Sequence, residues 1–153
     1  MANETKMSFS ASSTTVISLT AALANGSVAG GTTELDNSTD LYGMATATLS
    51  VPDGFAAAPN DRSRVDLYMV KNDVDGTDDD TSAPTGSDVE AADHVGSFLI
   101  YNTDEAQRKT INISLLGVKK ANFYIKNNCG QALSYTSNPI TVKVHPFTLK
   151  AAQ

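Results

Sequence analysis

The stretch Leu41-Tyr-Gly-Met-Ala-Thr-Ala-Thr-Leu-Ser-Val51 decides the fold class of this chain. Its residues alternate with a period of two, which is the repeat of a β-strand, and Pro52-Asp-Gly54 ends the run. One face carries small and aliphatic side chains, whereas the other carries mainly threonine. The alternation predicts a long strand buried on one face, and the small residues on that face predict close packing against a second sheet.

Six further segments show similar alternation or are rich in β-branched and aromatic residues, and turn residues separate them. They are Thr14–Leu19, Arg64–Lys71, Val95–Tyr101, Thr110–Leu116, Ala121–Asn127 and Ile140–Leu149. This spacing predicts an all-β fold, an antiparallel β-sandwich of the jelly-roll or Ig-like type with about seven to eight strands. Pro146 lies inside the last segment and predicts an edge strand or a bulge there, because proline cannot donate a ladder hydrogen bond.

The chain has 153 residues, which is the size of one domain. We expect residues 1–12 to form a polar N-terminal arm, either frayed or pinned by another subunit, and residues 13–150 to form a single β-sandwich domain. No stretch approaches the ~20 apolar residues of a membrane span, and residues 1–10 lack the apolar run of a secretory signal. The sequence therefore predicts no membrane partner.

Charge is distributed unevenly along the chain. The formal net charge is −6, yet the segment 73–93 alone carries eight acidic residues and no Lys or Arg. We expect this segment to be an acidic loop that is either merely solvated or a charged face for docking or spacing. Residues 94–153 have seven basic and two acidic residues, so the last third of the chain is basic. The acidic total argues against a nucleic-acid partner, and the basic last third weakens that argument.

The sequence carries no recognisable catalytic or metal-binding pattern. His94 and His145 lack zinc-ligand spacing, and the acidic run from Asp73 to Asp80 does not match the EF-hand loop, although a cation there stays possible on charge alone. Nucleotide-binding and nucleophile-elbow motifs are absent, and we expect no Ser to have a nearby His that would make it a nucleophile. Cys129 lies in a turn-like sequence and has no disulfide partner, which favours a structural role and a reducing compartment. We expect a non-enzymatic protein without cofactor or metal.

Several segments, taken in their order along the chain, resemble a group of small virion structural proteins of tailed bacteriophages. The resembling segments are Leu23-Ala-Asn-Gly-Ser27, Leu35-Asp-Asn-Ser-Thr-Asp-Leu-Tyr42, Val65-Asp-Leu-Tyr-Met-Val70, Val95-Gly-Ser-Phe-Leu-Ile100 and Asn122-Phe-Tyr-Ile-Lys-Asn-Asn-Cys-Gly-Gln-Ala-Leu-Ser134. They extend over most of the chain, from about residue 12 to residue 147. The chain departs from the group in lacking prolines before the segment around Phe123.

The resemblance implies a non-enzymatic β-sandwich that coats or reinforces a virion. The first hypothesis is a capsid decoration or cement protein, synthesised in the host cytoplasm and located on the capsid surface. It would bind the major capsid protein on the outer head surface as a homo-oligomer, a trimer or a dimer. Its partner-binding residues would be basic and in the last third of the chain. The candidates are Arg108, Lys109, Lys119 and Lys120.

Two alternatives stay open at this point. The first is a tail- or fibre-associated virion protein, in which a β-sandwich would serve equally well. The second is a carbohydrate-binding or adhesin module. It is disfavoured because sugar sites present aromatic platforms, and this chain has no Trp and only five Tyr and five Phe, most of them in expected strands.

Overall fold

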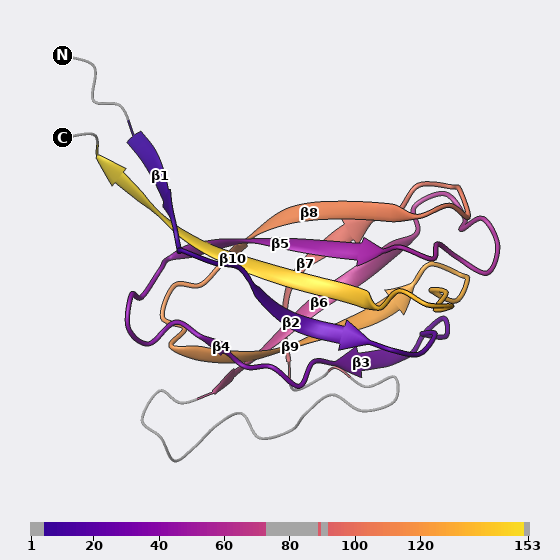
Figure 1. Cartoon of the computed structure of the whole chain (residues 1–153), viewed down its shortest axis with the longest axis horizontal. Helices are drawn as coiled ribbons and strands as arrows, with labels where there is room; N and C mark the ends of the chain where they lie inside the picture. The colour runs from indigo at the N-terminus through magenta and orange to yellow at the C-terminus, as the bar shows by residue number, and fades with distance from the viewer. Residues whose placement is uncertain (1–4, 73–88, 90–91, 152–153) are drawn as a thin grey trace.

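The computed structural model describes residues 5–72, 89 and 92–151, and every regular element within these ranges is a β-strand (Figure 1). The expected all-β class is therefore confirmed. The strands are β1 Thr5–Phe9, β2 Thr14–Leu19, β3 Val28–Gly30, β4 Leu35–Asp36, β5 Met44–Val51, β6 Arg64–Asn72, β7 Asp93–Leu99, β8 Gln107–Ser114, β9 Lys120–Asn128 and β10 Ile140–Ala151.

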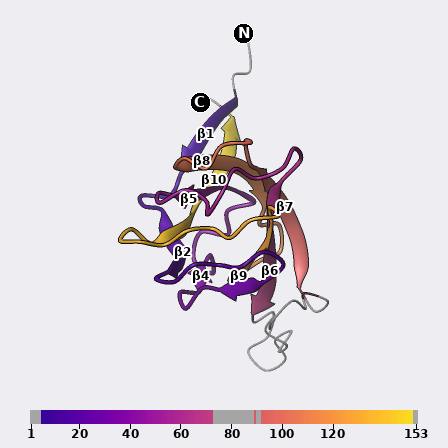
Figure 2. The same cartoon turned by 90° about the vertical axis from the view of Figure 1, so that its right-hand side faces the viewer.

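The strands form two antiparallel sheets that pack face to face. Sheet I has the order β1-β10-β5-β8, with β2 beside β1 along the same edge of β10. Sheet II has the order β3-β9-β6-β7, with β4 beside β3 along the edge of β9. Figure 2 looks from one end of the sandwich and shows the two layers, with β1 and the end of β10 rising away from both. The predicted antiparallel β-sandwich is thus the fold of the chain.

The strand order distinguishes the two kinds of sandwich that the sequence left open. Strand pairing is nested: β2 pairs with β10, β3 and β4 with β9, β5 with β8, and β6 with β7. This is the order of a jelly roll, in which eight strands fold as two Greek keys. An immunoglobulin sandwich would keep its first two strands in one sheet, whereas β2 and β3 lie in different sheets. The count exceeds eight because β1 is an addition and β3 and β4 divide one jelly-roll position.

The core lies between the inner faces of the two sheets. Strand β5 contributes Ala45, Ala47, Leu49 and Val51, each at most 1% exposed, as its alternation predicts. From sheet II, aromatic and aliphatic side chains of β6, β7 and β9 fill the opposite side. The largest of these are Leu67, Phe98, Phe123 and Ile125.

Two glycines set how closely the sheets approach along their sides. A Cβ at Gly31, between β3 and β4, would lie 1.5 Å from the backbone oxygen of Val16 in β2. On the other side, a Cβ at Gly96 in β7 would lie 2.6 Å from Cδ1 of Ile111 in β8. Only a residue without a side chain fits beside Val16, so Gly31 fixes the distance between the sheets on that side.

Pro146 is neither in an edge strand nor at the bulge, contrary to the sequence expectation. Strand β10 is central and pairs with β5 on one side along its whole contact, including Pro146 with Ala45. The bulge of β10 lies between Val142 and Lys143. On its other side β10 changes partner from β2 to β1, and there the Ser10 N–H donates to the Pro146 carbonyl at 2.9 Å. The N–H and C=O of a strand residue point to the same side of the strand. The N–H that Pro146 lacks would therefore point to the gap between β2 and β1, where no ladder hydrogen bond needs it.

The N-terminal arm is paired within its own chain over residues 5–9. Strand β1 runs antiparallel to the last five residues of β10, from Phe9 opposite Phe147 to Thr5 opposite Ala151. These two segments form a two-stranded ribbon, named here the terminal ribbon, that projects beyond the sandwich (Figures 1 and 2).

Most of the predicted acidic loop, and with it the question of a bound cation, lies outside the described residues. Within the described ranges, no helix is long and apolar enough to cross a membrane.

Candidate functional site

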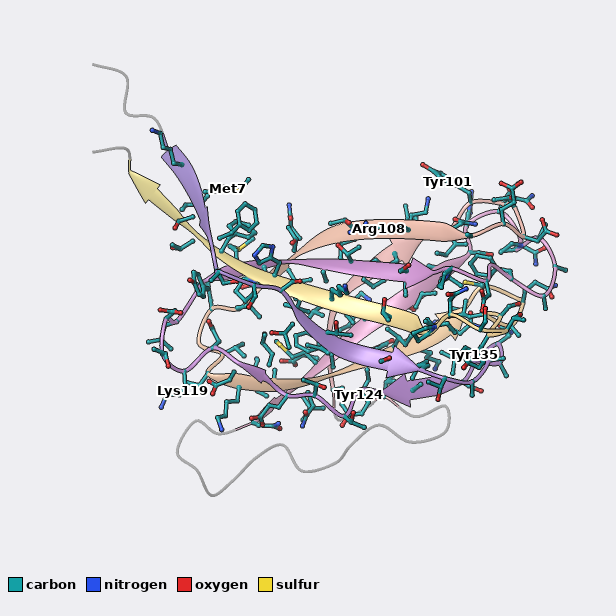
Figure 3. The ribbon with its side chains drawn as sticks, in the orientation of Figure 1. Met7, Tyr101, Arg108, Lys119, Tyr124 and Tyr135 are labelled. Carbon is teal, nitrogen blue, oxygen red and sulfur yellow. The ribbon has the colours of Figure 1, made fainter. Side chains whose placement is uncertain are left out.

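The two basic residues predicted in β8 point to opposite sides of that strand. Arg108 is exposed on the outer face of sheet I, as Figure 3 shows. Lys109 alternates in step with the inward-facing residues of β8. Because β8 is at the sheet edge, the Lys109 side chain reaches the Tyr101 ring, and its Nζ lies 3.0 Å from the ring centre. This cation–π contact ties Lys109 to the β7–β8 connection.

The other two predicted residues lie at the start of β9, a strand of sheet II. Lys119 is exposed just before β9, and Figure 3 shows it far from Arg108. Lys120 begins β9, and its Nζ lies 3.4 Å from Glu34 Oε1. The structure therefore keeps Lys119 and Lys120 together but separates them from Arg108, so the four predicted residues do not form one basic patch.

The outer face of sheet I gathers polar, mostly uncharged side chains into a continuous surface. Strand register places these residues in rows across β2, β10, β5 and β8, and Thr48 and Thr110 share a hydrogen bond of 2.9 Å between their hydroxyls. We call this surface the threonine face. It consists of Thr15, Ser18, Thr46, Thr48, Ser50, Arg108, Thr110, Asn112, Thr141, Lys143 and His145.

The charge of the threonine face has one sign. Arg108 and Lys143 are its charged residues, and they border a shallow hollow of about 140 Å³ with Thr48, Ser50 and Thr141. No carboxylate stands among the residues that the described strands present on this face. In a chain of net charge −6, this surface is therefore locally positive.

The threonine face continues into an apolar surface on the terminal ribbon. Phe9 stands opposite Phe147 and Met7 opposite Leu149, so these four side chains share one face of the ribbon. The ring centres of Phe9 and Phe147 lie 5.2 Å apart, and His145 of the threonine face lies 4.9 Å from Phe9. Met7 and Leu149 are each 58% exposed and Phe9 is 43% exposed. We call this the apolar ribbon face.

Sequence reasoning missed most of this surface. Lys143 and Phe147 lie in a predicted strand, but the sequence does not show which strands lie beside it. Met7 and Phe9 alternate with Lys6 and Ser8, a period-two signal that covers only one short segment of a polar arm. Such a short pattern gains meaning only once its partner strand is known.

On the opposite side of the molecule, the outer face of sheet II carries a buried carboxylate. Asp66 in β6 is 3% exposed. Its oxygens accept hydrogen bonds from Ser97 Oγ at 2.5 Å, Asn128 Nδ2 at 2.6 Å and Arg64 Nε at 3.0 Å. Burial raises the pKa of Asp66, but these hydrogen bonds and the Arg64 charge outweigh it and hold the pKa below its ordinary value. The cluster joins β7, β6 and β9 on their solvent side.

The same cluster brings a Ser beside a His, and its geometry bears on whether that Ser could be a nucleophile. His94 Nε2 lies 3.1 Å from Ser97 Oγ and 3.7 Å from Asp66 Oδ1. The arrangement differs from a catalytic triad, since the Ser97 hydroxyl already donates to Asp66 and the same His94 nitrogen faces both groups. The geometry supports a structural hydrogen-bond network.

Cys129 has the environment of a structural thiol. It is 1% exposed, and its Sγ lies 3.4 Å from the Arg64 carbonyl. Burial, together with the nearby Asp66 carboxylate, raises the pKa of the thiol to about 12. A thiol with this pKa is almost wholly protonated at neutral pH and is a poor nucleophile or metal ligand.

A polar cleft of about 340 Å³ lies where the terminal ribbon meets the sandwich. Asp36 and Asp40 line it together with hydroxyl groups and Pro146. The Ser38 hydroxyl and N–H both bind Asp36 and lower the pKa of that carboxyl. No group of three potential metal ligands occurs here or elsewhere in the described ranges.

Comparison with known proteins adds no relative: the chain matches no protein-family profile and no curated protein sequence.

Proposed function

We propose that this chain is a non-enzymatic virion structural protein of a tailed bacteriophage, a capsid decoration or cement protein. The observation that carries the proposal is the continuous outward surface formed by the threonine face and the apolar ribbon face. Contiguous exposed apolar residues on a small folded domain mark an interaction site. The jelly roll is an architecture used by viral capsid domains as well as by lectins and cupins, so the fold is compatible with this role.

The proposed partner is the major capsid protein, on the outer surface of the head. A protein that reinforces a lattice needs a broad docking surface, and the outer face of sheet I spans four strands. The outer edge of β1 has no partner among the described strands, which also allows strand pairing with another copy. A homo-oligomer, a trimer or a dimer, is therefore part of the proposal.

A carbohydrate-binding module has less support, because two of the tyrosine rings that could stack on a sugar are engaged in other contacts. Tyr101 is 71% exposed, but Lys109 Nζ occupies one face of its ring. Tyr68 meets His94 edge-on with ring centres 5.3 Å apart. Sugar platforms require an open aromatic face, and these contacts restrict it.

The test is the composition and labelling of purified particles. We expect this chain in the particles at a fixed ratio to the major capsid protein, and antibody label distributed over the head. Particles without the chain should also lose DNA at a lower temperature than complete particles. Absence of the chain from particles would refute the proposal, and label confined to the tail would favour the tail- or fibre-associated alternative.

A further inference from the structure

We infer that the threonine face and the apolar ribbon face together dock on a negatively charged protein surface of the lattice subunit, with the ribbon as its apolar anchor. This inference rests on the proposed function and adds the surface, the orientation and the partner chemistry. Sheet I would lie against the lattice, and sheet II with the Asp66 cluster would face away from it.

The charge of the surface identifies the chemistry of the partner. Arg108 and Lys143 stand on the threonine face among Thr, Ser, Asn and His side chains, while its described residues include no acid. Hydroxyl and amide groups can exchange water for partner groups at lower cost than carboxylates can. A surface of this kind fits a partner that offers carboxylates opposite Arg108 and Lys143.

The apolar ribbon face has the composition of an interface centre. Met and aromatic residues are enriched there in protein complexes, and acidic residues are depleted. Phe147 is already 4% exposed under Phe9, whereas Met7 and Leu149 stay largely open. A partner that covers Met7 and Leu149 would therefore extend the apolar contact that Phe9 and Phe147 already make.

The area available for burial on the apolar ribbon face favours a lattice subunit over a second ribbon as the binding partner. The exposed parts of Met7, Phe9 and Leu149 amount to roughly 300 Å², the size of the largest apolar patch on an ordinary monomer. A stable complex buries about 800 Å² on each partner. A second ribbon packed on the first would supply less than half of that area, so the partner must also cover the threonine face. A broad subunit surface does this.

The outer edge of β1 supplies a further means of attachment. Strand β1 pairs with β10 on one side and with no other described strand, so its other side can accept an extended segment of the partner. Such pairing would fix the orientation of the ribbon on the lattice through main-chain hydrogen bonds.

The experiment measures co-sedimentation of the full chain with heads assembled without it, using matched variants. Lys143→Glu changes the threonine face, and Arg62→Glu makes the same charge change at an exposed position just before β6 of sheet II. Leu149→Ser changes the apolar ribbon face, and Leu99→Ser, at a residue 68% exposed in β7, is its control. Circular dichroism and thermal unfolding confirm that each variant is folded.

We expect Lys143→Glu and Leu149→Ser each to weaken binding at least tenfold, and both controls to stay within twofold of the unchanged protein. Binding should also weaken as salt is raised. Unchanged binding by both face variants, or equal losses in the controls, would overturn the docking assignment alone. If Leu149→Ser instead converts an oligomer to monomers and leaves head binding intact, the ribbon joins copies of this chain and the inference fails. Failure of the unchanged protein to bind heads would refute the proposed function itself.

Discussion

At the scale of single residues, buried amide side chains hold the loops of the sandwich in place. Asn37 is 3% exposed, donates to the carbonyls of Tyr42 and Val118, and accepts from the Tyr42 N–H. Asn127 binds the carbonyls of Leu23 and Gln131 in the same way at the other end of the molecule. Each amide satisfies backbone groups that the sheets leave unpaired, so loss of either would leave buried polar atoms without partners.

Residue-level prediction from the sequence succeeded where local chemistry was sufficient. A turn at Cys129 follows from the neighbouring Asn and Gly, and the buried thiol agrees with a structural role. The network of Asp66, Ser97 and Asn128 was not predictable, because its members come from three strands and meet only through sheet register. An aspartate in an alternating strand is normally exposed, so nothing in its own segment indicates burial.

Cys129 gives a prediction on pH and stability. Its folded pKa, about 12, lies above its ordinary value of 9.0, so the stabilisation is complete below pH 9 and is lost as pH rises toward 12. Above pH 9 the unfolded chain binds fewer protons than the folded chain, which favours unfolding by up to about 1.4 kcal/mol per pH unit. Urea unfolding of the wild-type protein and of Cys129→Ala between pH 7 and pH 11 measures this.

The stability difference between the two proteins should shrink above pH 9. The Cys129→Ala variant is the control for the wild-type protein, because every titratable group other than the Cys129 thiol is present in both. Parallel pH profiles would show that the thiol is not shielded in the folded state.

At the scale of elements, long alternating strands were predictable and short ones were not. The segment Thr14–Leu19 is β2 as expected, and β5, β6, β9 and β10 lie within a few residues of their predicted limits. Strand β3 has three residues and β4 has two, and the Gly30-Gly31 pair at the end of β3 is typical of a turn. They are strands because β9 supplies a partner for both, which is a tertiary effect.

Gly31 gives the prediction at this scale. Gly31→Ala places a methyl group against the Val16 backbone, which can move away only if the sheets separate, so we expect the free energy of unfolding to fall by about 2–3 kcal/mol. Gly96→Ala meets only the end of the Ile111 side chain, which can change rotamer, and should cost less than about 1 kcal/mol. Chemical unfolding of both variants tests the comparison, and equal costs would mean that the sheets do not meet closely at Gly31.

At the scale of the whole molecule, the sequence predicted a sandwich but not its strand order. Pairing β2 with β10 joins segments more than a hundred residues apart, and no local pattern encodes such a partner. The separation of Arg108 from Lys119 has the same origin, since Arg108 is in sheet I and Lys119 directly precedes a strand of sheet II. The position of charged residues along the sequence therefore does not show which of them share a surface until the strand order is known.

The terminal ribbon gives the prediction at this scale. No residue of β1 belongs to the core cluster, so a chain without residues 1–9 should still fold and unfold cooperatively. The Phe9–Phe147 contact is lost, which should reduce stability by about 1–2 kcal/mol. Thermal unfolding followed by circular dichroism is the measurement, and a broad transition or aggregation would show that β1 is needed for the fold.

The pairing of the two end segments has a mechanical consequence. Thr5 and Ala151 are opposite each other at the outer end of the ribbon, so tension applied to both ends pulls directly across one pair of residues. The inter-strand hydrogen bonds of an antiparallel pair are perpendicular to the strands, so they lie along the direction of this force. Each hydrogen bond then bears the whole force in turn, and the ribbon would open one residue pair at a time. Beyond Phe9, the load would pass to Thr14 opposite Val144, where β2 leaves β10 in the same bond-by-bond manner. The ribbon should therefore open under tension before the two packed sheets of the sandwich separate.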